Sequence, residues 1–217
     1  MLYKMSATKL PRIICSAVLC TLMSGTLSNA DAMPAPQEPT EADQSPQHLY
    51  TQALDLLNED KLEAFYLLKS RLTAYPLYPY LEQKELEHNF DSIAQHHINL
   101  YSKEYEGIPT VYPLQQKWLS YLAANQRWKH YISAYRAAGV KSEQYECNYR
   151  NALLKTGQAS LAIKGIETLW NTGHSISDAC DPVFDYWITN THAPSSKLAY
   201  QRFWKAIENN NIGLAKY

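Results

Sequence analysis

The amino-acid sequence predicts an all-α fold, an α–α superhelix in which antiparallel helix pairs stack on one another. Past Pro46, apolar residues recur at the three- and four-residue spacing of amphipathic helices in nearly every stretch. Runs that alternate β-branched and polar residues, the pattern of half-buried strands, do not occur there. The breaks between the periodic stretches are short, and several contain proline or glycine, which often begin and end helices.

The helical periodicity divides the chain after Pro46 into about ten helices of roughly 10–16 residues each. Leu49, Ala53 and Leu57 define the apolar face of the first helix. Pro76 lies between the second and third helices, since proline disfavours helix in the residue before it. The expected spans are 47–58, 61–75, 79–88, 91–105, 110–124, 126–138, 142–156, 158–172, 179–191 and 195–210.

Glycines are expected to end several of these helices. Gly139, Gly157 and Gly173 each follow a periodic stretch, where a residue in the left-handed conformation commonly closes a helix. Gly165 falls inside an expected helix, so we predict that it allows two helices to approach closely.

The number and size of the helices favour serial stacking over a closed bundle. Antiparallel pairs of this length form a repeat of about 30–38 residues. Such pairs cannot bury their apolar faces alone, so each pair stacks on its neighbours. A compact bundle is the alternative, but so many short helices in series exceed what a simple bundle uses.

Residues 1–32 have the layout of a secretory signal peptide. Basic residues, including Lys4 and Lys9, precede an apolar stretch over 13–27 that is too short to cross a bilayer core of roughly 30 Å. Small residues that end at Ala30 or Ala32 then fit a cleavage site. We expect export to the periplasm with cleavage of this segment; an uncleaved N-terminal anchor is the alternative.

The rest of the chain divides into a leader and one domain. Residues 33–46 are rich in Pro, Glu, Gln and Ala without an apolar period, so we expect a disordered leader. Residues 47–217 are long enough for one helical domain with a sizeable core. Cys15 and Cys20 lie within the signal peptide and follow no small-residue pair of the lipobox kind, so we do not expect them to carry lipid.

The exported chain shows no pattern typical of nucleic-acid, metal or cofactor binding. Residues 1–32 hold three basic residues and one acidic residue, so the remaining chain has a formal net charge of −3 and lacks a basic stripe. His96 and His97 are adjacent, and adjacent helical residues do not share a face. No H-E-x-x-H, C-x-x-C, glycine-rich phosphate loop or G-x-S-x-G occurs. We therefore expect no metal, no cofactor, no nucleic-acid partner and no membrane span after signal removal.

Two further groups of residues are expected to be structural. Glu82, Glu85 and Glu87 lie behind Pro79 in one helix, where we expect a solvated face. The tryptophans fall at helical core spacings, so we expect them to pack between repeats; they are Trp118, Trp128, Trp170, Trp187 and Trp204. Exposed tyrosines remain available for sugar contacts, since an aromatic face can stack while its edge stays wet.

Cys147 and Cys180 are the two cysteines that remain after export, and an even pair in an oxidising compartment suggests a disulfide. The helix from Cys147 and the returning helix bring the chain back beside its starting level, which places Cys180 within reach. The bridge would close a loop of about 34 residues and contribute roughly 3–4 kcal/mol in the chain-entropy description. Two separate buried thiols are the alternative.

Several segments in this order resemble the soluble lytic murein transglycosylase family. Residues 72–82 (LTAYPLYPYLE) are similar to a segment near the start of these proteins. The longest similarity runs from 147–158 (CNYRNALLKTGQ) through 169–175 (LWNTGHS) to 178–184 (DACDPVF), and 206–215 looks like the next repeat. Cys147 and Cys180 also correspond to a cysteine pair that is bridged in the family.

The resemblance implies a fold and a chemistry. In this family a right-handed α-superhelix is bent into a U, and a separate lysozyme-like domain cleaves the β-1,4 bond between N-acetylmuramic acid and N-acetylglucosamine to a 1,6-anhydro sugar. The family's catalytic glutamate is followed by serine, whereas none of the thirteen glutamates here is. We therefore carry over no catalytic residue and expect a chain truncated before that domain.

Two hypotheses for function follow. In the first, the chain is the N-terminal, non-catalytic part of a lytic transglycosylase that orients the glycan strands of peptidoglycan, with other cell-wall enzymes as further partners. In the second, it is a free-standing periplasmic helical-repeat module that binds proteins.

Overall fold

The structure is a computed structural model that describes residues 45–216, and no strand occurs in that range. The expected signal peptide and the leader up to residue 44 lie outside the described residues. The α-helices, in chain order, are α1 (Pro46–Asn58), α2 (Leu62–Arg71), α3 (Tyr78–His88), α4 (Gln95–Glu104), α5 (Val111–Ala124), α6 (Trp128–Ala137), α7 (Glu143–Lys155), α8 (Ala159–Ala162), α9 (Ile166–Trp170), α10 (Asp181–Thr191), α11 (Ser196–Glu208) and α12 (Ile212–Ala215). A 3₁₀ turn, η2 (Asp178–Cys180), precedes α10.

The first helix begins one residue earlier than expected. Ser45 is its N-cap, and the Ser45 hydroxyl accepts a hydrogen bond from the His48 N–H at 3.2 Å. Pro46 occupies the first helical turn, where its missing N–H costs nothing. The last two residues of the expected leader therefore belong to the helical domain.

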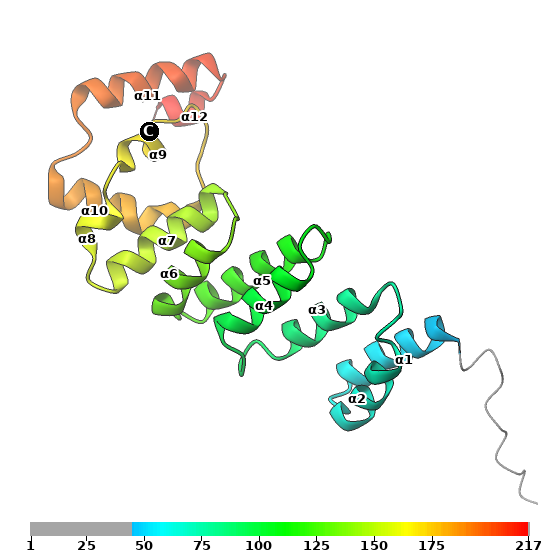
Figure 1. Cartoon of the computed structure of the whole chain (residues 1–217). Helices are drawn as coiled ribbons and strands as arrows, with labels where there is room; N and C mark the ends of the chain where they lie inside the picture. The colour runs from blue at the N-terminus through cyan, green and yellow to red at the C-terminus, as the bar shows by residue number, and fades with distance from the viewer. Residues whose placement is uncertain (1–44, 217) are drawn as a thin grey trace, which may run out of the picture. The chain divides into compact units, whose positions relative to one another are not determined.

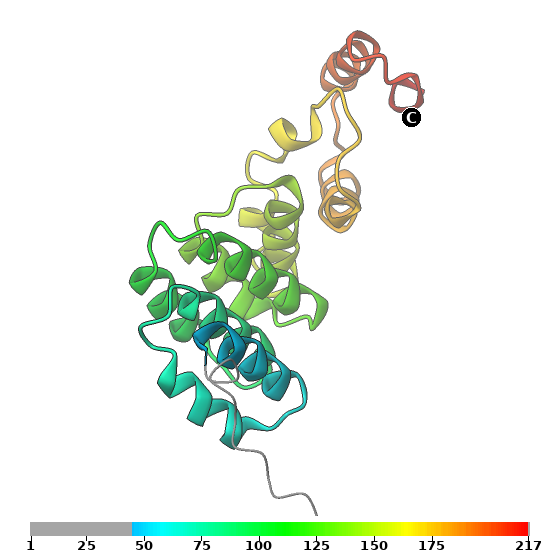
Figure 2. The ribbon, with the colours of Figure 1, turned by 90° about the vertical axis from the view of Figure 1, so that its right-hand side faces the viewer.

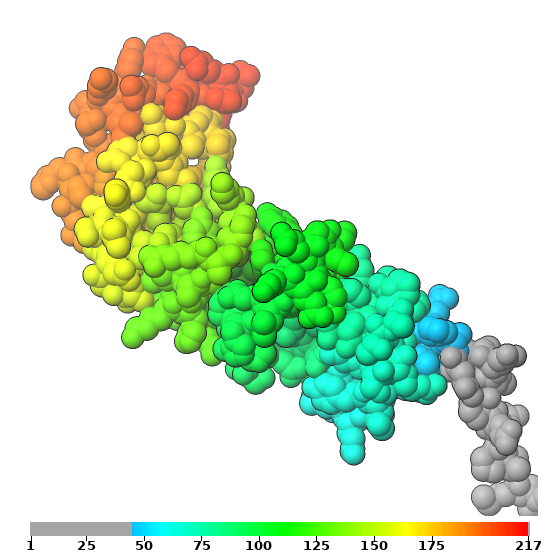
Figure 3. Space-filling model, in the orientation of Figure 1, coloured from blue at the N-terminus to red at the C-terminus, as the bar shows by residue number. Residues whose placement is uncertain are grey.

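The helices stack in series, which confirms the superhelical prediction over the closed bundle. The main contacts join each helix to its next or second neighbour, as in the contacts of α1 with α2 and α3 and of α5 with α3, α4 and α6. Further on, α7 contacts α10 across the short α8 and α9. Figures 1 and 2 show the helices progressing from α1 and α2 at one end of the described chain to α11 and α12 at the other. In the space-filling view, successive segments touch along the described chain (Figure 3).

Buried side chains form two clusters along this series. The first cluster belongs to α1, α2, α3 and the turn between α2 and α3; its members are Leu49, Ala53, Leu57, Phe65, Leu72 and Leu81. The second runs from Phe90 to Trp187 and includes the fully buried Leu119 and Tyr131. None of the described helices combines the length and apolar character needed to cross a membrane.

The tryptophan prediction is correct in part. Trp118 and Trp187 are buried, and Trp128 and Trp170 are half-buried against the second cluster. Trp204, however, is 45% exposed, because only Ala206 of α11 is buried and Trp204 lies on another face of that helix. Packing between the described repeats therefore does not explain Trp204.

The prediction of a single helix over 158–172 is wrong, because the helix is interrupted before Gly165 and forms two short helices, α8 and α9. Gly165 has a φ of 67° and is the N-cap of α9. A Cβ built there would meet no atom within 4 Å, so the predicted close approach of helices is also wrong. The glycine is needed for its left-handed backbone, which an L side chain adopts at a cost.

The three glycines expected to end helices differ from one another in the structure. Gly157 has a φ of 79° after α7, as expected of a left-handed helix end, but Gly139 and Gly173 do not have a positive φ. A Cβ at Gly173 would instead lie 2.3 Å from Asn209 Nδ2 and 2.4 Å from the Lys205 carbonyl oxygen. Gly173, rather than Gly165, is therefore the glycine of close approach, and it allows the loop after α9 to contact α11.

Replacing Gly165 with alanine should lower the free energy of unfolding by about 1 kcal/mol, since alanine is strained at positive φ. Urea unfolding followed by circular dichroism would measure the change. Gly213→Ala is the matched control, because Gly213 has no positive φ and a Cβ there meets only Asn211 Oδ1 at 3.7 Å. Equal stabilities of the two variants would contradict the assigned role.

Candidate functional site

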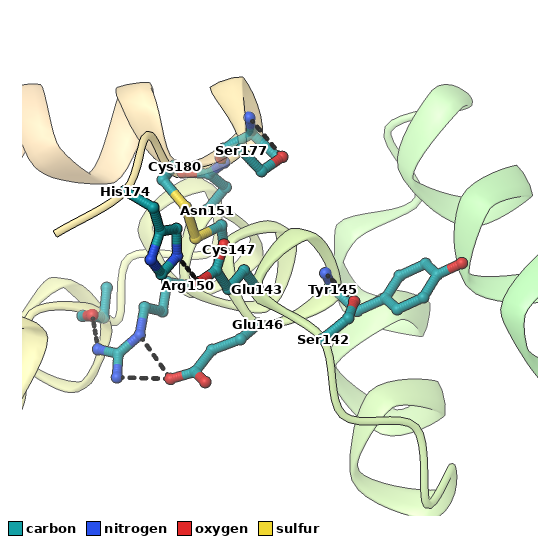
Figure 4. Close-up of a disulfide and its surroundings, with 12 residues drawn as sticks. Ser142, Glu143, Tyr145, Glu146, Cys147, Arg150, Asn151, His174, Ser177 and Cys180 are labelled. Atoms are coloured by element: carbon teal, nitrogen blue, oxygen red, sulfur yellow. Dashed lines mark hydrogen bonds and ion pairs between the residues drawn. A yellow bond between two sulfur atoms is a disulfide. The ribbon is translucent and has the colours of Figure 1, made fainter. Parts of the chain in front are cut away.

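A disulfide between Cys147 of α7 and Cys180 of η2 joins two segments that are 33 residues apart in the sequence (Figure 4). Both cysteines are fully buried, and their Cα atoms are 4.7 Å apart. This is the pair expected from the sequence, and the structure does not adopt the alternative of two separate thiols. Because Cys180 directly precedes α10, the disulfide fixes the start of α10 against α7.

Polar contacts on the same face of α7 hold the neighbouring turns. Asn151, one turn after Cys147, donates from Nδ2 to the carbonyl oxygen of Ala179 at 2.6 Å. Arg150 donates from Nη1 to the carbonyl oxygen of Ala162 at 2.7 Å, which holds the end of α8 (Figure 4). The His174 ring lies 2.7 Å from a Glu143 carboxylate oxygen and ties down the loop after α9.

A cleft lies between α9, α10, α11 and α12, and we call it the α9–α12 cleft. Its main cavity measures about 510 Å³, and an adjoining cavity of about 260 Å³ shares part of its lining. Trp170, Ile188, Arg202 and Leu214 line both cavities. The volume is within the roughly 300–1,000 Å³ typical of small-molecule sites.

The lining combines carboxylates with an aromatic ring, the groups that proteins use to contact sugars. Asp181 and Asp185 are exposed and lie one turn apart on α10, so they share a face. Trp170 is half-buried, with the Arg202 guanidinium 4.1 Å from its ring centroid. Carboxylates can accept hydrogen bonds from hydroxyl groups while apolar side chains contact C–H faces.

A second polar site lies at the other end of the described chain, and it corrects the expectation of a solvated face on α3. The side chains of Glu82, Glu85 and Glu87 are only 23%, 18% and 15% exposed. Lys69 of α2 contacts both Glu82, at 3.0 Å, and Glu85. Lys117 of α5 pairs with Glu87 at 2.8 Å. The expectation is wrong because cationic side chains from neighbouring helices cover this face.

Lys69, Glu82, Glu85 and Tyr105 form a group that we call the Lys69 cluster. The Tyr105 hydroxyl donates to Glu82 Oε2 at 2.5 Å. Burial alone would raise the pKa of Glu82, but the hydrogen bond from Tyr105 and the contact with Lys69 outweigh burial and lower it. Burial and the hydrogen bond to Glu82 raise the pKa of Tyr105. At neutral pH the carboxylate is therefore an acceptor and the phenol a donor.

The histidine pair behaves differently from the sequence expectation. The rings of His96 and His97 lie 3.8 Å apart between centroids, although the residues are adjacent. His97 Nδ1 lies 3.2 Å from the backbone nitrogen of Ala94, so its ring turns back over the start of α4. Among residues 45–216, no group of three or more His, Cys, Asp or Glu side chains is arranged to hold a metal ion.

The fold and these sites define an α-superhelical repeat protein whose turns are held by a disulfide and by ion pairs. The chain is similar to the soluble lytic murein transglycosylase of Salmonella typhimurium (strain LT2), with 26% identity over 200 residues. This similarity covers 92% of the chain and 29% of the relative, and it confirms the resemblance seen in the motifs.

Two solved structures are also similar. The 70 kDa soluble lytic transglycosylase of Escherichia coli has a TM-score of 0.64 and 24% identity over 78% of this chain and 27% of that one. An inactive mutant of lytic transglycosylase Slt from Pseudomonas aeruginosa has a TM-score of 0.60 and 27% identity over 76% of this chain and 27% of that one. The chain thus spans less than a third of the length of these relatives.

A family model described as Cucumovirus coat protein matches residues 144–217. The match covers about a third of the chain, and within the described residues it falls on the helices from α7 to α12. This share of the chain is too small to assign a family.

Neither the α9–α12 cleft nor the Lys69 cluster was predicted from the sequence. A partial signal existed for Asp181 and Asp185, which are four residues apart directly after a cysteine. For the Lys69 cluster the only signal was the three-residue spacing of Glu82 and Glu85, which does not reveal a lysine on another helix.

Proposed function

We propose that this chain is the non-catalytic helical scaffold of a lytic transglycosylase and that it orients the glycan strands of peptidoglycan in the periplasm. The main support is the similarity to soluble lytic murein transglycosylase over 92% of the chain. Stacked helix pairs offer extended surfaces suited to a long polymer. Cleavage to anhydro-muropeptides would belong to a lysozyme-like domain, since no glutamate here carries the family's catalytic signature.

The α9–α12 cleft is the proposed contact with the glycan. Asp181 and Asp185 would accept hydrogen bonds from sugar hydroxyls, and Trp170 with Ile188 would contact the apolar face of a ring. The disulfide supports this role because it anchors the helix that carries both aspartates.

The exported chain should sediment with purified murein sacculi and release no anhydro-muropeptides from them. The double variant D181A/D185A should bind about tenfold more weakly, the effect of losing a charge-assisted hydrogen bond. Asp55→Ala, an exposed carboxylate on α1, is the control and should bind like the unchanged chain. Anhydro-muropeptide release, or sedimentation that is absent from the start, would refute the scaffold proposal.

One observation favours the second candidate, a free-standing module that binds proteins. Tyr200, Phe203 and Trp204 are exposed on one face of α11, and aromatic side chains are enriched at protein interfaces. In the same sedimentation assay, Trp204→Ala separates the two functions. Weaker binding to sacculi would show that this face of α11 contacts the glycan. Unchanged binding would favour a protein partner for this face.

A further inference from the structure

A third cavity, between α2, α3 and α4, lies beside the Lys69 cluster and away from the α9–α12 cleft. It measures about 240 Å³. The lining residues are Lys69, Glu82, Glu85, Leu86, His97, Leu100, Tyr101 and Glu104. The volume is below the roughly 300–1,000 Å³ of sites for drug-sized ligands, so the cavity suits a single ring rather than a disaccharide.

The polar groups of this α2–α4 cavity are held in place before any ligand arrives. Glu82 accepts from both Lys69 and Tyr105, and Glu85 contacts the same ammonium group. The Tyr101 hydroxyl lies 2.9 Å from the Pro79 carbonyl oxygen and 2.6 Å from Thr110 Oγ1. A carboxylate has about four acceptor positions, so these contacts leave acceptors for a ligand.

The charge of the lining selects the kind of ligand. Three carboxylates, from Glu82, Glu85 and Glu104, line the cavity together with the single ammonium group of Lys69, so the lining is net negative. Anions such as phosphate or the carboxylate of a muramic acid are therefore disfavoured by like-charge repulsion. A neutral ring rich in hydroxyl groups supplies the donors that carboxylates accept.

The rim of the cavity supplies an apolar contact. Leu100 of α4 is 62% exposed, and it is an apolar side chain on a face of α4 whose other residues are polar. Leu86 of α3 is half-buried in the same lining. Together they would cover the C–H face of a pyranose ring while the carboxylates bind its hydroxyls.

We propose that the α2–α4 cavity is a subsite for one neutral N-acetylglucosamine unit of the glycan strand, bound through Glu82 and Glu85 with Leu100 against the ring. The proposal rests on the proposed function, because that function supplies a glycan as ligand. It adds a second contact point on the strand, lined by residues of α2, α3 and α4 and separate from the α9–α12 cleft.

The test uses the exported, oxidised chain and tri-N-acetylchitotriose, a neutral oligomer of N-acetylglucosamine, in an amide chemical-shift titration. We expect shifts of the amides in α3 and α4 around Glu85 and Leu100. Glu85→Gln and Leu100→Ala should each weaken binding, about tenfold for Glu85→Gln. N-acetylmuramic acid and diaminopimelate serve as the anionic and the amine-bearing probes, and neither should shift the same amides.

Matched controls are available for both variants. Glu87→Gln removes an ion-paired, half-buried glutamate of α3 that does not line the cavity. Leu67→Ala removes a leucine of α2 that is 68% exposed and also lies outside the lining. Both controls should bind chitotriose like the unchanged chain. Because Leu100 is exposed, Leu100→Ala should leave the fold intact. It therefore tests the cavity even if Glu85→Gln disturbs folding.

The outcomes separate this proposal from the proposed function. If the chain sediments with sacculi but chitotriose shifts no amide around the cavity, the subsite is wrong and the scaffold function stands. If diaminopimelate shifts these amides and chitotriose does not, the cavity binds an amine and the sugar assignment is overturned. Failure to bind either sacculi or chitotriose would refute both.

Discussion

Reduction of the Cys147–Cys180 disulfide should lower the free energy of unfolding by about 3–4 kcal/mol. The bond closes a loop of about 34 residues, and opening it returns conformational entropy to the unfolded chain. That loop contains α8, α9 and the glycine-rich turns, which contribute few buried side chains of their own. Urea titrations with and without reductant, followed by tryptophan fluorescence, would measure the difference because Trp187 is buried beside this region.

The double variant C147A/C180A provides the control for that experiment. It should be less stable than the oxidised chain and should not respond to reductant. Coinciding midpoints for the oxidised and reduced chains would show that the contacts of Asn151 and Arg150 already hold η2 and α8 in place without the bond.

Gly173→Ala should lower the free energy of unfolding by about 2–3 kcal/mol, because the new methyl group meets backbone atoms of α11. A Cβ at this position would lie 2.4 Å from the carbonyl oxygen of Lys205 and 2.9 Å from its carbonyl carbon. Backbone atoms cannot rotate aside as a flexible side chain can, so α11 must move. The movement would also break the 2.8 Å hydrogen bond from Lys205 Nζ to the Asn171 carbonyl oxygen.

Chemical denaturation of Gly173→Ala alongside Gly139→Ala would check this expectation. Gly139 has no positive φ and a Cβ there meets no atom within 4 Å, so its replacement should be neutral or stabilise by about 0.4–1 kcal/mol. Similar effects from both substitutions would mean that α11 adapts to the added group at little cost.

Most of the helices could be predicted from the sequence, because the apolar residues of each buried face recur at helical spacing. The expected start of the first helix was one residue late, and Leu49, Ala53 and Leu57 do form its buried face. Helix ends in the second half were harder, since the roles of Gly165 and Gly173 depend on backbone angles and on a segment about 30 residues away. Periodicity within one helix carries neither kind of information.

The candidate sites were less predictable for a related reason. Glu82 and Glu85 resemble a solvated face when α3 is considered alone, but Lys69 of α2 contacts both of them and Tyr105 contacts Glu82. The tryptophans were assigned correctly where a following helix covers them, as for Trp118, and incorrectly for Trp204. Contacts between residues far apart in the sequence decide these cases. The disulfide, in contrast, could be predicted because only two cysteines remain after residue 32.

The division of the interior into two clusters of buried residues has a consequence for how the molecule responds to stress. Leu49 to Leu81 pack among themselves, and the disulfide lies wholly within the other cluster. Amide protons in α1 and α2 would therefore exchange through openings that leave the bridged region protected, whether or not Cys147 and Cys180 are oxidised. Damage or proteolysis at one end would spare the ligand contacts proposed for the other.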